Sequence, residues 1–252
     1  MKAMILAAGL GTRLRPLTDS RPKALVEINS RTLLEITLTR LRTFGVTEFI
    51  INVHHFADQV TGYLKSNNNF GLRIEISREE VLLDTGGGLK KAAWFFLEDP
   101  ARLDEPFLLH NVDVISTIDL TRMLQFHKEN QALATLAVQS RESNRQLLFN
   151  HDLQLVGRRV DNKDSVISSE ARNPSSIPLR PLAFSGIHII SPRLLPQLNE
   201  DGIFSIIDSY LRLSAKSQKI LAFRADQYYW RDLGRPADLA QAALDIQQNV
   251  LP

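Results

Sequence analysis

A short apolar run that breaks into a loop of small residues is the feature that most constrains this chain. Met4-Ile5-Leu6 predicts a buried strand, and the small side chains of residues 7–11 let the backbone approach a ligand closely. Two cations, Arg13 and Arg15, follow directly. Because unpaired amide groups beside cations at the end of a strand can hold a polyphosphate, this stretch predicts a phosphate-binding loop.

The loop fits neither of the two common phosphate-binding patterns. A Walker loop needs Gly, four residues and then Gly-Lys-Ser or Gly-Lys-Thr, and the chain has no such string. A dinucleotide-binding fingerprint needs a third glycine three residues after Gly11, where Leu14 stands. The motif therefore belongs to another class of phosphate-binding protein.

Apolar periodicity predicts alternating strands and helices in the first half of the chain. We expect strands at residues 49–53, 72–76 and 107–112 and helices at residues 32–44, 56–65 and 88–97. This alternation indicates an α/β fold with a Rossmann-like, mostly parallel sheet flanked by helices. Ligands of such sheets bind beyond the carboxyl ends of the strands, so the loop after Leu6 and the turn after Val112 should meet in one cleft.

The second half is less regular, and we expect irregular insertions there. The pattern predicts helices at residues 119–130, 204–214 and 236–248, strands at residues 132–138, 184–190 and 219–224, and a hairpin at residues 145–158. Residues 161–181 are polar, contain three prolines and predict a surface loop. Since no repeat or linker interrupts the chain, we expect a single domain over residues 1–252.

Composition excludes several classes of function. The formal net charge is only +2 with no basic run, so a nucleic-acid-binding role is not expected. The chain has no cysteine, which excludes disulfides and thiolate metal sites. It shows no signal-peptide region and no apolar stretch long enough to cross a bilayer, so we expect a cytoplasmic protein without membrane association. No nucleophile motif such as Gly-x-Ser-x-Gly occurs.

The segment of residues 6–28, LAAGLGTRLRPLTDSRPKALVEI, resembles the opening signature of the sugar-1-phosphate nucleotidylyltransferases. The shared features are small residues, Gly-x-Gly-Thr-Arg, a proline and then Pro-Lys-x-Leu. The resemblance implies the nucleotide-diphospho-sugar transferase fold, with residues 1–115 binding the nucleotide and residues 116–252 the sugar. It implies nucleotide contacts from Leu6, Ala7, Ala8, Gly9, Gly11, Thr12, Arg13 and Lys23.

Two aspartates match the metal-binding positions of that family. Asp113 follows an apolar strand, where family members commonly have Gly-Asp and bind the catalytic Mg²⁺; here Val112 replaces the glycine. Asp232 resembles the second metal motif, an aromatic residue followed by Asp-x-Gly. Carboxylate oxygens are ligands that Mg²⁺ prefers. From the residues alone, Asp113 could instead be a turn aspartate, and Asp232 could pair with Arg231 or Arg235.

Further nucleotide contacts follow from the resemblance. It places Gly87 and Gly88, in the glycine run that opens a helix, against the nucleoside, with Glu80 as an acceptor for the base and Asn111 at the nucleotide. A flexible turn with a solvated glutamate is the alternative.

On the sugar side, Ser185 and Gly186 resemble the family's sugar-contacting strand, although Gly186 could simply mark a bulge. The adjacent His54 and His55 point to opposite sides of a strand end, so we interpret them as structural rather than as metal ligands.

The resemblance implies transfer of a nucleotidyl group from a nucleoside triphosphate to a sugar 1-phosphate, releasing pyrophosphate. Arg13 would bind the departing phosphates, Lys23 would draw the two reacting phosphates together, and Asp113 would be the third catalytic residue. Mg²⁺ would lie between Asp113 and Asp232, and Lys23 would also contact the sugar phosphate. The attacking phosphate oxygen is already anionic, so no general base is required.

Three functions stay open at this stage. An Asn-x-His-His segment at residues 52–55, similar to that of N-acetylmuramate-1-phosphate uridylyltransferases, favours UTP with that sugar phosphate. GTP with mannose or heptose 1-phosphate is the alternative within the enzyme class. A non-catalytic regulatory subunit is the third, favoured by Val112 but opposed by the presence of Arg13, Lys23 and both aspartates. We expect a monomer or small homo-oligomer without the left-handed β-helix extension of longer relatives.

Overall fold

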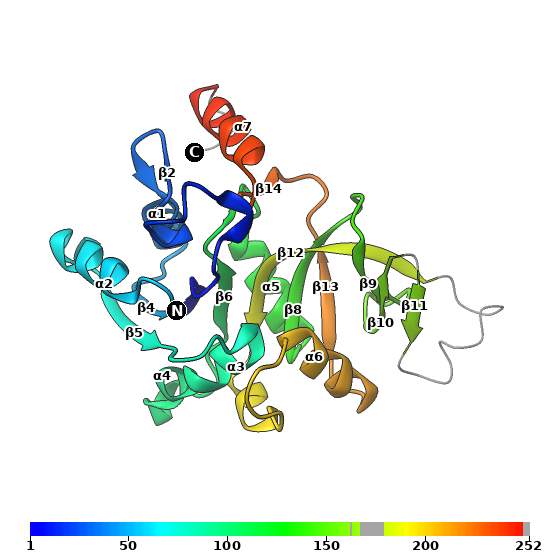
Figure 1. Ribbon diagram of the computed structural model, residues 1–252. Helices are drawn as coiled ribbons and strands as arrows, with labels where there is room; N and C mark the ends of the chain where they lie inside the picture. Colours follow the sequence, from blue (N-terminus) through cyan, green and yellow to red (C-terminus); the bar gives the residue numbers. More distant parts are fainter. Residues whose placement is uncertain (162, 167–178, 249–252) are drawn as a thin grey trace.

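The computed structural model describes residues 1–161, 163–166 and 179–248. Its first half forms parallel β-strands joined by helices, with β1 between β4 and β6 and with β5 beside β4 (Figure 1). The elements of this half are β1 (Lys2–Leu6), β2 (Glu27–Ile28), β3 (Arg31–Thr32), α1 (Leu33–Thr43), β4 (Glu48–Val53), α2 (Ala57–Ser66), β5 (Arg73–Arg78), α3 (Asp84–Lys91), α4 (Ala93–Leu97) and β6 (Phe107–Asn111).

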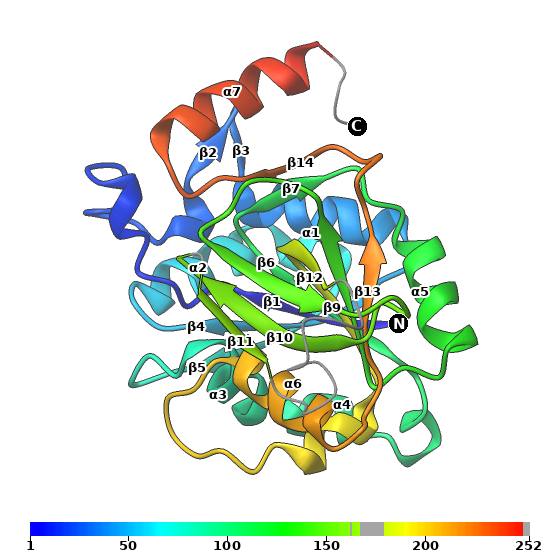
Figure 2. The same cartoon turned by 90° about the vertical axis from the view of Figure 1, so that its right-hand side faces the viewer.

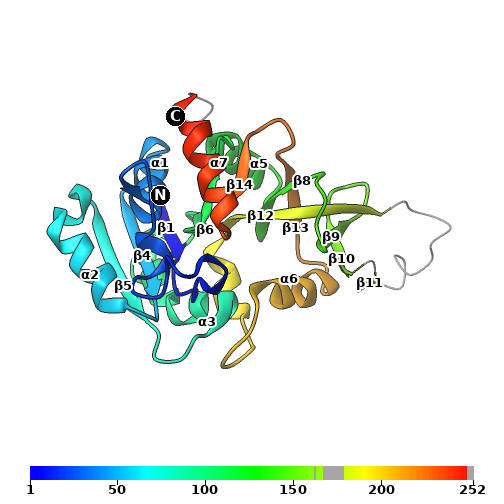
Figure 3. The same ribbon diagram turned by 45° about the horizontal axis from the view of Figure 1, so that its top comes forward.

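The second half extends the same sheet with mostly antiparallel pairs. The long strand β12 pairs with β6, β8 and β9. It extends from the parallel strands to the antiparallel strands β9, β10 and β11 (Figure 3). The elements are β7 (Val114–Ser116), α5 (Leu120–Glu129), β8 (Ala134–Gln139), β9 (Arg145–Phe149), β10 (Leu155–Val160), β11 (Lys163–Val166), β12 (Arg180–Ile190), α6 (Ile206–Ala215), β13 (Ile220–Arg224), β14 (Trp230–Asp232) and α7 (Pro236–Gln247).

One ten-stranded sheet results, in the order β11-β10-β9-β12-β6-β1-β4-β5, with β8 beside β12 and β13 beside β8. The predicted α/β class and helix-flanked sheet are confirmed. The parallel arrangement covers the first half and the β8–β13 pair, whereas the ladders around β12, β9, β10 and β11 are antiparallel.

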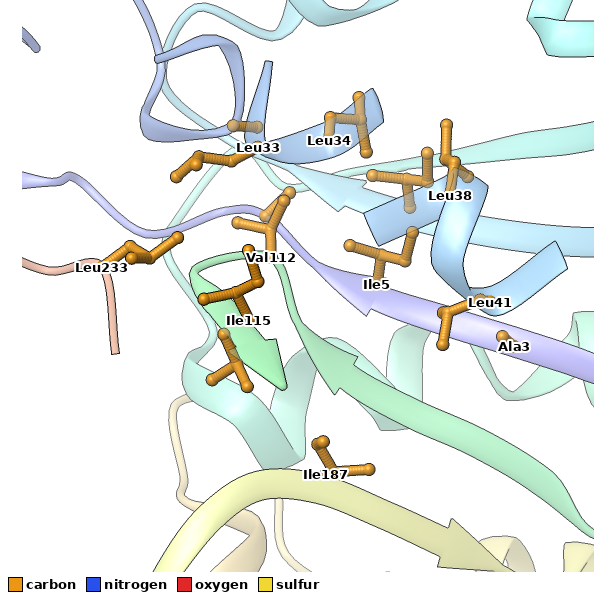
Figure 4. Close-up of a cluster of buried hydrophobic side chains, with 14 of the residues drawn as sticks. Ala3, Ile5, Leu33, Leu34, Leu38, Leu41, Val112, Ile115, Ile187 and Leu233 are labelled. Atoms are coloured by element: carbon orange, nitrogen blue, oxygen red, sulfur yellow. The ribbon is translucent and has the colours of Figure 1, made fainter. Parts of the chain in front are cut away.

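Alternation along the strands builds a separate core on each face of the sheet. Ala3 and Ile5 of β1 face α1 and join the first core, part of which Figure 4 shows, while Met4 between them joins the second core. Helices α3, α4 and α6 cover that second face (Figures 1 and 2). Because both faces are covered, the parallel strands are apolar on both sides, as their sequences are.

Two sequence predictions are wrong in detail. The helix expected from residue 88 begins at Asp84, and it ends at Lys91 before the separate helix α4. Of the surface loop expected at residues 161–181, residues 163–166 form β11 and residues 180–181 belong to β12. Residues 162 and 167–178 lie outside the described residues. Within the described part of the chain, no helix combines the length and apolarity needed to cross a membrane.

Candidate active site

A cavity of about 360 Å³ opens beyond the carboxyl ends of the parallel strands. The loop after β1 and the turn after β6 both reach it, so their predicted convergence is confirmed. Its walls also include segments that follow β4 and β5, and one residue from the second half of the chain. The lining residues are Leu6, Ala7, Ala8, Gly9, Lys23, Asn52, Glu79, Leu82, Asp84, Thr85, Asn111, Val112, Asp113 and Ile203.

The predicted phosphate loop lies at the mouth of this cavity, and it folds around Gly11. Gly11 has a φ of +65°, and a Cβ there would lie 3.0 Å from Thr18 Cγ2 and 3.2 Å from Lys23 Cβ. Thr18 Oγ1 donates to the carbonyl oxygen of Gly11 at 2.9 Å. The missing side chain therefore lets the loop pack directly against Lys23. Thr12 and Arg13 are exposed and do not line the cavity.

Lys23 and Asp113 form an ion pair inside the cavity. Lys23 is the first residue of a 3-10 turn at residues 23–25, directly after Pro22. The side chain of Lys23 is buried. The two side chains are only 9% and 18% exposed, so water screens their charges weakly. Asp113 does lie in the turn after β6, and its carboxylate is paired with Lys23 there.

A short antiparallel pair brings Asp232 to Asp113. Strand β14 lies beside β7 (Figure 2), with Asp232 opposite Val114. The backbone N–H of Leu233 donates to the carbonyl oxygen of Asp113 at 2.7 Å. Burial, and then the negative charge of Asp113, raises the pKa of the Asp232 carboxyl. Two carboxylates that repel each other across a cavity edge form a site suited to a cation.

The donor set of this pair fits Mg²⁺. Within the described ranges no cluster of three or more histidine, aspartate or glutamate side chains could hold a metal ion. Two carboxylates are nevertheless sufficient for Mg²⁺, because this ion keeps several waters and takes phosphate oxygens from its substrates. Asp113 and Asp232 are therefore the residues that could hold it.

Arg13 reaches the same place from the phosphate loop. Its Nη2 lies 3.8 Å from Asp232 Oδ1, so Asp232 pairs with Arg13 rather than with Arg231 or Arg235. The backbone N–H of Gly234 donates to Asp232 Oδ1 at 2.8 Å, and a Cβ at Gly234 would lie only 2.5 Å from that oxygen. The glycine of the Asp-x-Gly motif thus leaves room for the arginine and the carboxylate together.

A buried hydrogen-bond network that sequence reasoning missed supports the cavity floor. The N–H of Ala7 donates to Asn52 Oδ1 at 2.8 Å, and Asn52 Nδ2 donates to Glu79 Oε1 at 2.8 Å. Glu79 Oε2 accepts from the N–H of Leu83 at 2.9 Å. The network joins the phosphate loop to the ends of β4 and β5 and to the start of α3. The one available signal was a polar residue, Asn52, next to the end of an apolar strand.

Several predicted nucleotide contacts lie elsewhere. Glu80 is exposed and outside the lining, whereas its neighbour Glu79 is buried in it. Gly87 and Gly88 lie inside α3, and Asp84 and Thr85 take their place in the lining. A Cβ at Gly88 would lie 2.8 Å from Glu79 Oε1, so this glycine packs against the network.

The predicted sugar strand does not line the cavity, but it packs against Asn111, which does. Gly186 has a φ of +72° in a bulge of β12, and a Cβ there would lie 2.9 Å from Asn111 Nδ2. Trp230 Nε1 donates to the carbonyl oxygen of Ser185 at 2.7 Å, and the Arg141 guanidinium stacks 3.7 Å from the centre of the Trp230 ring. The bulge is thus tied to β14, which carries Asp232.

The two adjacent histidines have separate neighbours. His54 Nδ1 hydrogen-bonds to the carbonyl oxygen of Glu79 at 2.9 Å, which attaches it to the cavity floor. The His55 ring lies 3.8 Å from the ring of Phe56. The two side chains therefore have different contacts: His54 helps to fix the backbone of Glu79, and His55 packs against Phe56.

Comparisons with known proteins agree with this geometry. The sequence profile of the family described as Nucleotidyl transferase matches residues 2–147. The chain is 34% identical over 248 residues to the N-acetylmuramate alpha-1-phosphate uridylyltransferase of Caulobacter vibrioides, covering 96% of this chain and 95% of that protein. This chain belongs to the sugar-1-phosphate nucleotidyltransferase family.

Other known proteins are similar to this chain as well. Mannose-1-phosphate guanyltransferase beta-B of Xenopus laevis is 30% identical over 254 residues, covering 99% of this chain and 66% of that protein. The crystal structure of HddC from Yersinia pseudotuberculosis complexed with GMP-PN superposes with a TM-score of 0.75 at 21% identity, covering 97% of this chain and 99% of that chain. The predictions of the family, of an enzyme and of the nucleotide-diphospho-sugar transferase fold are confirmed.

Proposed function

We propose that this nucleotidyltransferase joins UTP and N-acetylmuramate 1-phosphate to form the UDP-sugar and pyrophosphate, with Mg²⁺ as its cofactor. The observation that carries the proposal is the β7–β14 pair, which brings Asp113 and Asp232 together beside Lys23. The 34% identity to a uridylyltransferase acting on that sugar phosphate, over nearly the full length of both proteins, supports the choice of substrates.

The chemistry follows from the charges around the cavity. Asp113 and Asp232 would hold Mg²⁺, which when bound would supply charge neutralisation to the reacting phosphates. Lys23 offers an ammonium beside Asp113 where the α-phosphate and the sugar phosphate must meet, offsetting their repulsion. Arg13, whose guanidinium lies beside Asp232, would bind the departing pyrophosphate. The sugar phosphate oxygen is an anionic nucleophile, so alignment and charge neutralisation are sufficient.

The remaining residues divide between nucleotide and sugar. Residues 1–115 supply most of the nucleotide site through the phosphate loop, the Asn52–Glu79 network and Asn111. Residues 116–252 supply the sugar site through Ser185 and Gly186 in the bulge of β12.

A second candidate is GTP with mannose 1-phosphate. The 30% identity to a mannose-1-phosphate guanyltransferase over 99% of this chain favours it. It requires the same metal and phosphate groups and differs only at the base and the sugar.

A pyrophosphate-release screen tests the proposal. UTP, GTP, CTP, dTTP and ATP would each be combined with N-acetylmuramate, mannose, heptose and glucose 1-phosphates, with Mg²⁺ and with EDTA. We expect the highest kcat/KM for UTP with N-acetylmuramate 1-phosphate and no turnover in EDTA. A higher value for GTP with mannose 1-phosphate would select the second candidate instead.

Variants test the residues of the proposed mechanism. Asp113→Asn and Lys23→Ala should each lower kcat by about 100-fold or more, since each removes a charge that acts on the transition state. Asp152→Asn, at an exposed position far along the chain, is the matched control and should retain full activity. Wild-type turnover in Asp113→Asn would remove the metal assignment.

A further inference from the structure

The glycine run of α3 forms a seat for a loop from the second half of the chain. This loop, residues 200–204, leads into α6 and is named here the α6 loop. The N–H of Gly86 donates to the carbonyl oxygen of Phe204 at 2.9 Å, and the N–H of Phe204 donates to the carbonyl oxygen of Leu83 at 3.2 Å. A Cβ at Gly87 would lie 2.5 Å from the carbonyl oxygen of Gly202. Because Gly86 and Gly87 have no side chains, the backbone of α3 can contact the backbone of the α6 loop directly.

A lysine on the next turn of α3 holds the other end of the α6 loop. Lys90 Nζ donates to the carbonyl oxygen of Glu200 at 2.6 Å and pairs with Asp201 Oδ1 at 2.7 Å. The loop is thus fixed at both ends, which gives the residues between them a defined position.

Ile203, which lies between these two attachment points, lines the cavity although it is 65% exposed. It is the one lining residue among the described residues that comes from beyond position 113. Since Phe204 hydrogen-bonds to Leu83, Ile203 lies close to Leu82, which also lines the cavity. The two aliphatic side chains form an apolar wall that is open to solvent, and a ligand that covers this wall would gain by removing it from water.

The charges of the same wall decide which part of a ligand it would receive. Glu79 and Asp84 line the cavity beside Leu82, so negative charge repels phosphate there. The cations that attract phosphate, Lys23 and Arg13, lie at the Asp113–Asp232 end. An aromatic ring with N–H donors fits an apolar wall flanked by carboxylates.

We propose that Ile203 packs against the nucleobase of the bound nucleoside triphosphate, so that the α6 loop of the second half completes the nucleotide site. This inference rests on the proposed function and deepens it. It assigns the glycine run of α3 the role of seating the α6 loop, and it makes base binding depend on a residue outside residues 1–115.

The test compares Ile203→Ser with Val81→Ser in the full-length protein. Val81 is also an exposed aliphatic residue, 59% exposed, but it does not line the cavity. Binding of UTP and of inorganic tripolyphosphate would be measured by calorimetry in Mg²⁺, with circular dichroism as the check on folding. We expect Ile203→Ser to weaken UTP binding about fivefold, as partial loss of one aliphatic contact would. Tripolyphosphate, which has no base, should bind both variants like the wild type.

The other outcomes overturn the inference. Unchanged UTP affinity in Ile203→Ser would show that this side chain does not touch the base. Equal weakening of UTP and tripolyphosphate would assign the effect to the phosphate end, and a raised KM for the sugar phosphate alone would assign Ile203 to the sugar. Normal wild-type pyrophosphate release alongside any of these results leaves the proposed function standing. A wild type that binds neither UTP nor GTP would remove both.

Discussion

Lys23 forms an ion pair with Asp113, the carboxylate that would bind the metal in the proposed reaction. Its ammonium pairs with Asp113 in a position where both side chains are largely buried. A divalent ion that binds Asp113 must therefore displace this ammonium or share the carboxylate with it. Displacement would free Lys23 to meet the phosphates that arrive with the metal, so one residue would neutralise Asp113 before binding and the substrates after it.

Lys23→Met should separate these two roles. We expect Mn²⁺, added without nucleotide, to bind the variant about tenfold more tightly than the wild type, because the Lys23 ammonium no longer competes for Asp113. This change corresponds to about 1.4 kcal/mol in the free energy of Mn²⁺ binding. Turnover should nevertheless fall, because the variant lacks the cation that the phosphates need. Mn²⁺ binding can be followed by electron paramagnetic resonance, with Lys91→Met at an exposed site of α3 as the control. An unchanged or weaker Mn²⁺ affinity would show that the ammonium does not compete.

At the scale of elements, α3 shows how tertiary packing overrides local preference. A run of three glycines is typical of a loop, since each glycine costs a helix about 1 kcal/mol relative to alanine. The helix nevertheless begins at Asp84 and includes Gly86, Gly87 and Gly88, because these face the α6 loop and the Asn52–Glu79 network too closely for any side chain.

Two glycine-to-alanine substitutions should therefore have effects of opposite sign. Gly88→Ala should lower the free energy of unfolding by about 1–3 kcal/mol, because its Cβ would meet Glu79 Oε1 at 2.8 Å and Asn52 Nδ2 at 2.9 Å. Gly62→Ala in α2, where no atom lies within 4 Å of the new Cβ, should raise it by about 0.5–1 kcal/mol. Urea unfolding measures both. A stabilising Gly88→Ala would mean that helix propensity outweighs packing here.

The sequence predicts those parts of the fold that have a long apolar pattern or an extended motif. Strands β1, β4 and β6 and helix α1 follow apolar patterns, and the extended motif at residues 6–28 indicates the loop that lines the cavity. It does not predict β7 and β14, which have three residues each and no periodicity, although their pairing joins Asp113 to Asp232. The sequence also does not distinguish Glu80 from Glu79: both follow β5, but only Glu79 lines the cavity, where it accepts hydrogen bonds from Asn52 and Leu83.

At the scale of the whole molecule, buried histidines link stability to pH. Burial lowers the pKa of His127 to about 4, with nearby cations adding to the effect, and burial lowers that of His188 to about 3, with His110 contributing. Both have hydroxyl partners inside the fold, Ser191 and Thr135 for His127 and Tyr210 for His188. In the unfolded chain they titrate near their ordinary pKa of about 6.5.

The sign of the pH dependence follows from these values. Below pH 6.5 the unfolded state binds protons that the native state does not, so stability is greatest above pH 6.5 and falls as the pH drops toward about 4. Each histidine should contribute about 1.4 kcal/mol per pH unit in this window. His127→Gln should reduce this slope of the unfolding free energy, measured in urea at several pH values. His151→Gln, at an exposed site, should leave it unchanged. Equal slopes in all three proteins would show that burial of His127 does not control acid stability.

Ligand binding should stabilise both halves of the chain together, because residues from both halves form the proposed site. Lys23 and Asp113 come from the first half, whereas Ile203 and Asp232 come from the second. A nucleotide with its metal would contact both sets at once, but either ligand alone would contact only part of them. We therefore expect UTP with Mg²⁺ to raise the Tm by more than the sum of the two separate effects.

At a free UTP·Mg²⁺ concentration of 100 times Kd the stabilisation is about 2.7 kcal/mol, or roughly 5–10 °C for a chain of this length. Thermal unfolding with UTP, with Mg²⁺ and with both measures the coupling directly. Asp113→Asn should remove the part of the shift that needs the metal but keep any effect of UTP alone, while Asp152→Asn should behave like the wild type. If the separate shifts simply add in the wild type, nucleotide and metal bind independently, and the carboxylate pair at the β7–β14 junction is not where they meet.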